Sequence, residues 1–404
     1  MRTHPYFVDA FPSSRRPSYP TLRGPASARV VIVGGGLTGV ACAAAFASAG
    51  VQTILLEADR IGAGATGGSP GLLRHDFDAS FLDTVARHGL RDARHLWDSA
   101  RRASLDFAAA LRRLRIPCAV QAQVISEVTR GGAQSVKQLR REYEARRAAG
   151  LEVSWQTAKS LQRDVRITAD GAMRTKSGVL DPYRAAIGLA AAAAARGGGL
   201  FERSPVLRVR ANKKAVEIRS ARGVVTAEVV LIATGGALSD LRALRRHLPL
   251  QRSFFVATDR LPAAVRKEVG SRSAAIAEVE TPKRLLRWLD DDRVLFSQSC
   301  DTAGRRPAPA VVVANAMELM YRLTTLYPPI SGVQPAWAWD IETYGSPDDL
   351  PLIGRHRNFP RHLFALGTGR SGAGVAWLAA RVLLRNYFEE PAARDEVFGF
   401  GRVL

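Results

Sequence analysis

A short glycine-rich stretch near the start of the chain constrains the fold more than any other feature of the sequence. Residues 30–39 read V-V-I-V-G-G-G-L-T-G, so four aliphatic residues run into Gly34, Gly36 and Gly39, spaced as G-x-G-x-x-G. The aliphatic run predicts a strand buried on both faces, and the small apolar residues 40–49 predict a packed helix. In such a unit one glycine allows a tight turn, one lets the backbone approach a pyrophosphate, and one lets helix and strand pack closely. The stretch therefore predicts a dinucleotide site at the N-terminus of the helix, where unpaired N–H groups attract phosphate.

Two features that follow this unit support the same prediction. Residues 52–56 predict a second strand, which ends at Glu57. A carboxylate at that place can accept hydrogen bonds from both hydroxyls of an adenosine ribose and would repel a 2′-phosphate. Residues 60–71 then contain far more glycine than a connector needs, which indicates a loop whose backbone amides face phosphates. A flexible hinge is the alternative interpretation of that loop.

Composition limits the class of protein and its surroundings. The chain has 404 residues, 47% of them hydrophobic, which is enough for one large or two ordinary domains. No apolar run approaches the roughly 20 residues that cross a bilayer, and the segment after Arg15-Arg16 is polar and proline-rich, so we expect neither a membrane span nor a signal peptide. Cys42, Cys118 and Cys300 are isolated, which indicates no disulfide framework and no metal site, and favours the cytoplasm.

The chain carries a formal net charge of +21, and most of its basic residues are arginine. A polyanionic partner, such as nucleic acid or a membrane surface, is one interpretation. The arginines are spread along the whole chain, without a basic tail or a basic stripe interleaved with aromatic residues. We therefore favour a solvated arginine-rich surface over nucleic-acid binding.

The pattern along the chain predicts an α/β fold whose parallel strands come from separate stretches. Residues 1–27 are rich in Pro, Ser and Arg and predict an extended arm on the surface. Helices are expected at 81–114, 135–149, 181–195, 316–326 and 375–388, the third beginning with Asp181-Pro182 as N-cap and first residue. Further strands are expected at 120–128, 172–179, 206–209, 215–219, 224–227, 229–236, 254–258, 285–297 and 363–366. Parallel-strand signals lie at the beginning, middle and end, so the nucleotide domain is predicted to be discontinuous.

Five segments together carry a resemblance to a known family. They are V-I-V-G-G-G-L-T-G with L-L-E-A-D-R-I-G-A-G-A-T-G-G, L-D-P-Y-R at 180–184, V-V-L-I-A-T-G-G at 229–236, D-D-L-P-L-I-G-R at 348–355, and L-F-A-L-G-T-G-R-S-G-A-G at 363–374. In this order they resemble the FAD-dependent oxidoreductases of the D-amino-acid-oxidase-like superfamily, which includes glycine oxidase, sarcosine oxidase and γ-glutamylputrescine-oxidase-like enzymes. The resemblance implies a discontinuous Rossmann-like FAD-binding domain and a mixed α+β substrate domain with an antiparallel sheet. The expected ranges are 1–27 for the arm, 28–85, 180–248 and 345–404 for the FAD domain, and 86–179 and 249–344 for the substrate domain.

The resemblance also implies which residues hold FAD. It places the adenosine at Gly34–Gly39 and Glu57, with main chain around Val206 facing the adenine. It places the pyrophosphate near Arg60, Thr66 and Ser69, and the flavin ring at the Gly367–Gly374 turn. A glycine-rich helix N-terminus suits the flavin, because its N–H groups can donate to the negative N1–C2 carbonyl region of the reduced ring. The complete implied set is Gly34, Gly36, Leu37, Thr38, Gly39, Glu57, Ala58, Arg60, Ala65, Thr66, Gly67, Ser69, Val206, Thr234, Gly235, Gly367, Gly369, Arg370, Ser371, Gly372 and Gly374.

Three departures from the family indicate how this chain differs. Sarcosine-oxidase-type enzymes attach the flavin to a cysteine shortly before the Pro-Asp that matches Pro347-Asp348, but the corresponding position here is about Ile341, so a noncovalent FAD is expected. A histidine and a lysine of the relatives' terminal turn correspond to Ala373 and Ala376, and a glycine pair expected to close a hairpin corresponds to Ser297-Gln298. The substrate side has therefore diverged.

Four residues are candidates for the chemistry. Arg74, in L-L-R-H, lies where sarcosine-oxidase-like relatives place an arginine that binds the substrate carboxylate, and a planar guanidinium can bind a carboxylate through two hydrogen bonds. A surface salt bridge is the alternative for Arg74. His75 could tune protonation near pH 7 or be a structural histidine. Arg287, on a hairpin that faces the flavin in the family, and Arg370, in the flavin turn, could each supply positive charge toward oxygen or a substrate anion.

These observations predict a cytoplasmic flavoenzyme that oxidises the C–N bond of an amino acid or small amine to an imine by hydride transfer to the flavin. Its partners would be that substrate and oxygen or another electron acceptor. One alternative is a dehydrogenase of the same fold that passes electrons to a quinone or carrier protein. The other is a flavin-dependent RNA-modifying or nucleic-acid-binding protein, which a basic patch beside the flavin would favour.

Overall fold

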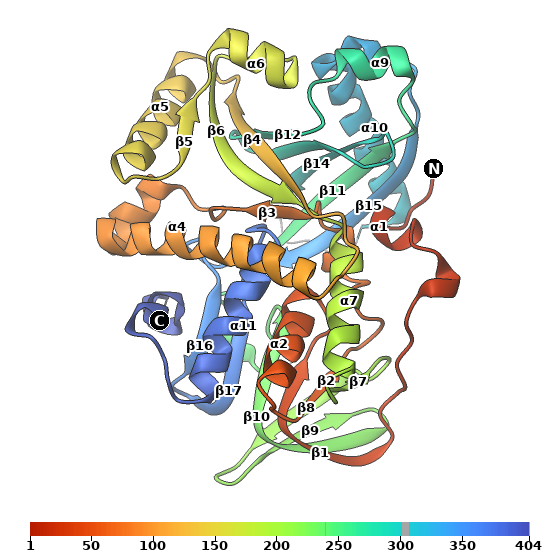
Figure 1. Ribbon diagram of the computed structural model, residues 1–404, viewed down its shortest axis with the longest axis vertical. Coiled ribbons are helices and arrows are strands. Elements are labelled where there is room, and N and C mark those ends of the chain that lie inside the picture. Colours follow the sequence, from red (N-terminus) through yellow and green to blue (C-terminus); the bar gives the residue numbers. More distant parts are fainter. Residues whose placement is uncertain (239, 301–306, 404) are drawn as a thin grey trace.

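The computed structural model describes residues 1–238, 240–300 and 307–403, and their strands form two sheets that occupy the two ends of an elongated molecule (Figure 1). The first sheet, in the lower half of Figure 1, has eight strands within the described residues, in the order β16-β17-β10-β1-β2-β7, with β9 beside β10 and β8 beside β9. These strands are β1 (Gly24–Val33), β2 (Thr53–Leu56), β7 (Gly199–Phe201), β8 (Val206–Ala211), β9 (Val216–Ser220), β10 (Gly223–Gly235), β16 (Leu352–His356) and β17 (Phe359–Leu366).

Strands β17, β10, β1, β2 and β7 run parallel to one another, with Val33 of β1 beside Leu56 of β2 and Ile232 of β10, while β16 and β9 are antiparallel to β17 and β10. Their residues are almost all aliphatic and buried, because the sheet is covered on both faces. Helices α2 (Leu37–Ser48), α7 (Pro182–Ala194) and α11 (Gly374–Tyr387) cover one face together with the long α4 (Phe81–Arg113). Helix α7 begins as predicted, because the Asp181 carboxylate accepts a hydrogen bond from the Arg184 N–H and Pro182 occupies the first turn.

The second sheet has nine strands within the described part of the chain, in the order β15-β11-β14-β13-β12-β4-β6-β3, with β5 beside β6. Its strands are β3 (Leu72–Arg74), β4 (Gln121–Thr129), β5 (Val153–Trp155), β6 (Gly171–Val179), β11 (Leu250–Thr258), β12 (Ala274–Glu278), β13 (Arg284–Trp288), β14 (Val294–Cys300) and β15 (Pro335–Tyr344). All its pairs are antiparallel except β4 with β12. The two sheets confirm the predicted α/β class, with a mixed parallel sheet and a second, mostly antiparallel sheet.

The two faces of the second sheet have different surroundings because successive side chains alternate along a strand. On β11, Phe254 and Val256 pack in the cluster that contains the buried side of α10 (Pro309–Leu326). Ser253 and Phe255 face the opposite way, toward the first sheet, and line a cavity between the two sheets. The sheet therefore has one face for its own core and one face for the site.

Shorter elements connect these layers. They are α1 (Tyr6–Asp9), η1 (Ser13–Arg15), α3 (Ala65–Gly68), α5 (Gly132–Ala148), α6 (Ala158–Val165), α8 (Arg242–Arg245), α9 (Ala263–Glu268), η2 (Pro328–Ile330), η3 (Ala393–Phe398) and η4 (Phe400–Arg402). Among the described helices, none combines the length and the apolar composition that crossing a bilayer requires.

The structure differs from the sequence-based expectation at two places. The N-terminal arm is not simply extended on the surface: residues 6–9 form helix α1, whose Tyr6 and Phe7 are buried, and strand β1 begins at Gly24. The region 285–297 forms the expected hairpin, with antiparallel strands β13 and β14, but Ser297 and Gln298 lie inside β14 and not at a hairpin turn. In the arm, a tertiary contact overrides the local pattern of the sequence. In the region 285–297, the turn lies between β13 and β14, before these two residues.

Candidate active site

The carboxyl ends of four parallel strands meet at the edge of the first sheet that faces the second sheet. Strands β1, β2, β10 and β17 end at Val33, Leu56, Gly235 and Leu366, and each leads directly into one of the glycine-rich or acidic segments of the sequence. Ligands of open α/β sheets bind at this edge, because loops at the carboxyl ends of parallel strands leave a crevice. Segments more than 300 residues apart in the chain thus lie side by side.

The first glycine turn can be built only with glycine at two positions. Gly34 has a φ of +106°, and a Cβ there would lie 2.6 Å from the Ala233 carbonyl oxygen. A Cβ on Gly39 would lie 1.8 Å from the Gly34 carbonyl oxygen, so any side chain would separate α2 from the turn. Strand, turn and helix are therefore packed at backbone contact, as the motif predicts.

The N-terminus of α2 remains open toward the cavity. A Cβ on Gly36 would meet only the Thr66 hydroxyl, at 3.3 Å, and the Leu37 N–H donates to that hydroxyl at 2.9 Å. Leu37, Thr38, Thr66 and Ser69 all line the cavity. The first turn of α2 and the second glycine loop thus form one surface, which suits a pyrophosphate that approaches the helix N-terminus.

Glu57 lies at the end of β2 beside the first glycine turn. Its carboxylate accepts hydrogen bonds from the Gly35 N–H at 2.6 Å and the Asp59 N–H at 2.8 Å. Burial raises the pKa of Glu57, and these two backbone N–H groups oppose the rise. A carboxylate has about four acceptor sites, so acceptor capacity remains for the two hydroxyls of a ribose. The residue fits the role predicted for it.

A cavity of about 220 Å³ lies between the glycine turns and the second sheet. Its lower side comes from the start of α2, the loop before β3 and the turn before α11, and its roof comes from β11, β13, β14 and β15. The lining consists of Leu37, Thr38, Ala65, Thr66, Ser69, Pro70, Gly71, Leu72, Arg74, Asp78, Ser253, Phe255, Ala277, Glu278, Lys283, Arg284, Leu285, Ser297, Ser299, Ile341, Thr343, Thr368, Gly369, Arg370, Gly372, Ala373, Val375 and Ala376.

The last glycine turn contacts strand β3 directly. Gly372 has a φ of +84°, and a Cβ there would lie 2.9 Å from the Leu72 carbonyl oxygen. The Ala373 N–H donates to the same oxygen at 2.7 Å. A Cβ on Gly374 would lie 2.1 Å from the Ser104 hydroxyl oxygen, so α11 also packs closely against α4. These contacts hold the start of α11 at the cavity wall, where its backbone N–H groups can face a ligand.

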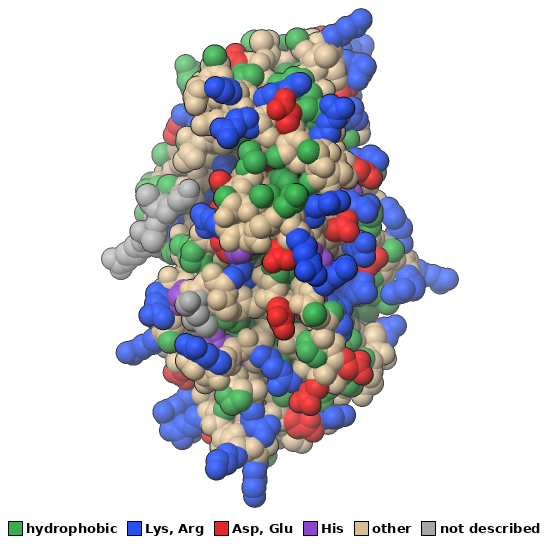
Figure 2. Space-filling model, turned by 90° about the vertical axis from the view of Figure 1, so that its left-hand side faces the viewer, with side chains coloured by type: hydrophobic (Ala, Val, Ile, Leu, Met, Phe, Trp, Pro, Cys, Tyr) green, Lys and Arg blue, Asp and Glu red, His purple; other side chains and the backbone are tan. Residues whose placement is uncertain are grey.

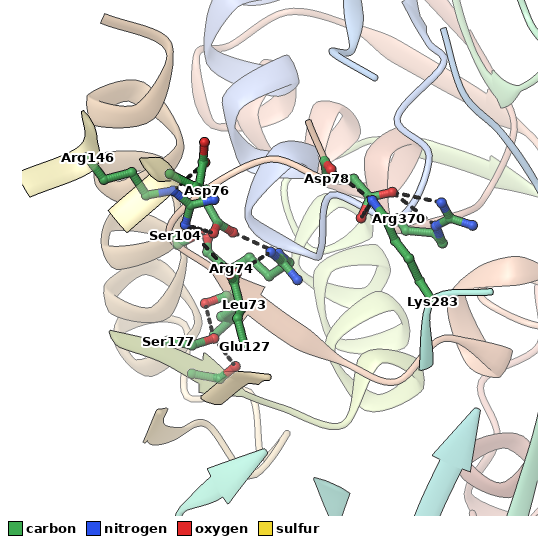
Figure 3. Close-up of polar contacts among 12 residues, drawn as sticks. Leu73, Arg74, Asp76, Asp78, Ser104, Glu127, Arg146, Ser177, Lys283 and Arg370 are labelled. Atoms are coloured by element: carbon green, nitrogen blue, oxygen red, sulfur yellow. Dashed lines mark hydrogen bonds and ion pairs between the residues drawn. The ribbon is translucent and has the colours of Figure 1, made fainter. Parts of the chain in front are cut away.

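Two groups of charged side chains stand at this cavity, as Figure 3 shows. In the first group, Asp78 pairs with Arg370 at 2.9 Å and with the Lys283 ammonium at 3.3 Å. Burial opposes ionisation of Asp78, but Lys283, Arg370 and Arg74 outweigh it and lower the pKa of Asp78 to about 2. Because Arg370 precedes α11 and Lys283 follows β12, this carboxylate links the two sheets across the cavity.

The second group contains Arg74, at the end of β3. Its Nε donates to Asp76 at 2.7 Å, and its Nη2 lies 3.4 Å from Glu127. Arg146 of α5 in turn pairs with Asp76 at 3.3 Å, Glu127 at 3.6 Å and Glu142 at 2.7 Å. Burial lowers the pKa of Arg74, but the negative charges of Asp76 and Glu127 raise this pKa by more than burial lowers it. The guanidinium is therefore charged. Arg74 is therefore no surface salt bridge: its side chain is 12% exposed and lies at the cavity wall.

Two of the four candidate catalytic residues lie away from this cavity within the described structure. His75 follows Arg74 and points to the other side of the chain, into a separate hollow that it shares with Asp76 and Trp97. Arg287 is buried and donates to the carbonyl oxygens of Pro70 at 2.6 Å and Trp288 at 3.0 Å. Burial lowers the pKa of Arg287 to about 10. Arg287 thus supports the loop before β3 from behind and does not face the cavity.

The residues predicted to hold FAD also fall into two groups, those that line the cavity and those that do not. Those that line the cavity are Leu37, Thr38, Ala65, Thr66, Ser69, Gly369, Arg370 and Gly372. Those that shape the turns around it, or lie farther away, are Gly34, Gly36, Gly39, Glu57, Ala58, Arg60, Gly67, Val206, Thr234, Gly235, Gly367, Ser371 and Gly374. Val206 begins β8 beside β9, and Thr234 donates to the Gly236 carbonyl oxygen at 2.5 Å.

Sequence reasoning missed several residues of the lining. The charged ones are Asp78, Glu278, Lys283 and Arg284, and the roof is formed by Ser253, Phe255, Leu285, Ser299, Ile341 and Thr343. The alternation of polar and apolar residues along β11 and β14 could have indicated a second buried face. No pattern in the sequence places Asp78 beside Arg370, which is 292 residues away.

The basic residues are dispersed over the face of the molecule that Figure 2 shows. Figure 2 shows Lys and Arg side chains over the whole of the visible face, interspersed with acidic and apolar groups and not gathered in one patch. The mouth of the cavity carries charges of both signs, since Asp78, Glu278, Lys283 and Arg284 all line it. On this face, the surface favours a solvated arginine-rich protein over a nucleic-acid interface.

Comparison with known proteins points in one direction. The sequence profile of the family described as "DAO: FAD dependent oxidoreductase" matches residues 29–385. The chain is 26% identical to the gamma-glutamylputrescine oxidoreductase of Escherichia coli over 95% of its own length and 89% of that protein. It is 25% identical to a probable oxidoreductase, OrdL, of Haemophilus influenzae, over 90% of its own length and 84% of that protein. The crystal structure of glycine oxidase from Geobacillus kaustophilus superposes with a TM-score of 0.78 at 22% identity, covering 94% of this chain and 100% of that one.

Proposed function

This chain belongs to the DAO family of FAD-dependent oxidoreductases, and we propose that it oxidises the C–N bond of an amino acid or small amine to an imine by hydride transfer to the flavin. One observation carries the proposal: the cavity joins the glycine turns to a roof of mainly apolar and hydroxyl side chains, and a buried arginine stands at its wall. Such a cavity can hold a planar ring on one side and a small carboxylated molecule on the other.

We propose that the FAD domain, residues 28–85, 180–248 and 345–404, holds the cofactor through the backbone at Gly34–Gly39, Glu57 and the Gly367–Gly374 turn. The flavin, when bound, accepts the hydride, so the remaining work of the protein is binding, orientation and electrostatics. The N–H groups at the start of α11 would stabilise negative charge on the reduced ring. The close backbone contacts at Gly34, Gly39 and Gly372 support this placement, because side chains there would force apart the backbone segments that form the cradle.

The substrate would be oriented by Arg74 and enclosed by the roof. The Nε and Nη2 of Arg74 are engaged with Asp76 and Glu127, and in the described part of the chain its Nη1 has no hydrogen-bond partner. That group can donate to a substrate carboxylate at the cavity wall. Phe255, Leu285 and Ile341 would exclude water from the reacting C–N bond and protect the imine until release.

The cofactor is proposed to be noncovalent and the enzyme cytoplasmic. Cys42 and Cys118 are buried free thiols that do not line the cavity, whereas Ile341 does line it, at about the position where the family resemblance implies the cysteine of covalent relatives. Acid precipitation of the yellow protein should therefore release the flavin into the supernatant, as measured by absorbance. Flavin that stays in the washed pellet would contradict noncovalent binding.

The electron acceptor is oxygen in the simplest form of this proposal, with a quinone or carrier protein as the alternative. Reduction of the flavin by substrate without air tests the reaction independently of the acceptor. Readmission of air then distinguishes the two acceptors, because an oxidase recovers its yellow colour rapidly and a dehydrogenase requires the added carrier.

A further inference from the structure

Arg74 lies at the boundary between two hollows. It lines the inner cavity described above and also a wider outer chamber of about 610 Å³, whose walls come largely from α5 and the segment after β12. The two spaces share Arg74, Asp78, Ala277, Glu278 and Lys283, so they adjoin at these side chains. A substrate that enters from the outer chamber therefore passes this guanidinium.

Glu127 is held differently from the other acids around Arg74. It is buried, with 6% of its surface exposed, and lies between two guanidinium groups at 3.4 Å from Arg74 and 3.6 Å from Arg146. Asp76, by contrast, contacts the Nε of Arg74 at 2.7 Å. Glu142 accepts hydrogen bonds from Arg146 at 2.7 Å, from the Phe81 N–H at 2.7 Å and from two further donors at 3.0 Å. Asp76 and Glu142 thus have short charge-assisted hydrogen bonds, whereas Glu127 has only long contacts with its two guanidinium partners.

The charges in this cluster leave little capacity for another anion. Within this cluster two guanidinium groups face three carboxyl groups, and the residues that pair with Glu127 on the neighbouring strands, Met173 and Ala277, are uncharged. Asp78 also acts on Arg74, but it is paired with Lys283 and Arg370 and therefore does not need Arg74 as its partner. An additional carboxylate at Arg74 would therefore meet a cluster whose own carboxyl groups already outnumber its guanidinium groups. In a buried site such an excess is relieved by protonation of the least stabilised acid.

On the basis of the proposed function, in which Arg74 binds the substrate carboxylate, we propose that Glu127 is the counter-ion that competes with this carboxylate for Arg74 and takes up a proton when the carboxylate binds. Arg74 is thereby selective for an anion that can displace Glu127 from its guanidinium. The step is a proton transfer without redox change: hydronium or a buffer acid loses a proton, and a carboxylate oxygen of Glu127 forms the new O–H bond.

The direction of the pH dependence follows from this competition. Burial raises the pKa of Glu127, with Arg146 and Arg74 opposing the rise, so the carboxyl protonates more readily than an ordinary glutamate. At lower pH Glu127 becomes neutral, Arg74 loses a competitor, and anions bind more tightly. Affinity should therefore weaken as pH rises, by at most about tenfold per pH unit for one linked proton.

The test uses the FAD-loaded protein and benzoate, a carboxylate without an amine, so that no turnover occurs. Isothermal titration calorimetry in two buffers of different ionisation enthalpy, between about pH 5.5 and 8.5, where benzoate stays ionised, measures the protons taken up per benzoate. We expect uptake that rises to as much as about one proton somewhere in this range. Glu127→Gln should abolish the uptake, make the affinity independent of pH, and bind benzoate at least as tightly as the unaltered protein at pH 8.5.

Two further variants separate the alternatives. His75 is the histidine that interacts electrostatically with Asp76 of the same cluster, and burial lowers its pKa. His75→Gln should leave the proton uptake unchanged if Glu127 is responsible. Arg74→Lys should weaken benzoate binding at all pH values, and unaltered binding in that variant would contradict the proposed role of Arg74 itself.

The outcomes are distinct for each claim. If benzoate binding depends on Arg74 but involves no proton uptake at any pH, the role of Glu127 is refuted and the proposed function stands. The same holds if uptake persists in Glu127→Gln. Should that variant fail to fold, the uptake measured on the unaltered protein and on His75→Gln still decides. Failure of the unaltered protein to bind benzoate at any pH would contradict both claims.

Discussion

Gly39→Ala should give a protein that takes up little or no FAD. The substitution adds one methyl group, and by helix propensity alone Ala would stabilise α2 by about 1 kcal/mol. The added Cβ would, however, lie 1.8 Å from the Gly34 carbonyl oxygen, which belongs to the backbone and cannot rotate away. Either α2 or the glycine turn must shift, and overpacking of this kind costs about 1–3 kcal/mol or more. The helix N-terminus and the turn would then no longer form one surface.

The expected loss in FAD affinity is at least about 100-fold, because displacement of two charge-assisted hydrogen bonds removes about 3 kcal/mol or more. Flavin fluorescence during titration of the apoprotein measures it. Ser48→Ala, in the exposed last turn of the same helix, is the matched control and should bind FAD normally. A Gly39→Ala protein with normal FAD affinity would show that α2 does not present its N-terminus to the cofactor.

Arg74→Lys should slow flavin reduction by carboxylated substrates far more than by amines without a carboxylate. Lysine keeps the charge but loses the planar set of N–H donors, so the hydrogen bond of Nη1 to the substrate is removed or misdirected. The loss should be about 1.5–3 kcal/mol, or roughly 10–150-fold in the rate constant of reduction divided by the substrate dissociation constant. Anaerobic stopped-flow measurement of both kinds of substrate gives this ratio.

The same substitution should also lower the melting temperature, because Arg74 holds the buried Asp76 and Glu127. Removal of one partner from a buried ion pair costs about 3–5 kcal/mol, and the retained charge of lysine should keep the effect below that range. Arg141→Lys, an exposed arginine of the outer chamber, is the control for the exchange of Arg for Lys. An equal loss with carboxylated and uncarboxylated substrates would assign Arg74 a structural role only.

The parts of the fold that depend on local rules could be predicted from the sequence. The turn at Gly34–Gly39 needs glycine for steric reasons, and Asp181 caps a helix through its own carboxylate, with Pro182 in the first turn, so both motifs determine their structure locally. The family resemblance predicted how these segments are arranged in one fold. The structure confirms the α/β class with a second, mostly antiparallel sheet. Elements whose conformation is determined within a few residues are therefore the predictable ones.

The parts that depend on distant contacts could not be predicted in the same way. Arg287 lies in the region 285–297, for which the sequence predicts β-structure. Whether its side chain faces the cavity depends on how the Pro70–Gly71 loop packs over β13. His75 follows Arg74 directly, and the chain direction after β3 turns it away from the cavity. Tyr6 is buried because the second sheet offers Trp337 as a partner, with ring centroids 5.1 Å apart. Only the assembled structure shows these arrangements.

The most direct test of the central claim is the anaerobic reduction of the FAD-loaded protein by a panel of amino acids and small amines. The account predicts that at least one compound bleaches the flavin with a rate that saturates, and that it yields a carbonyl product together with ammonia or an amine from hydrolysis of the imine. Dithionite serves as the control that the bound flavin can be reduced. A flavin that dithionite reduces but no amine or amino acid of the panel bleaches would contradict the proposed oxidation of a C–N bond.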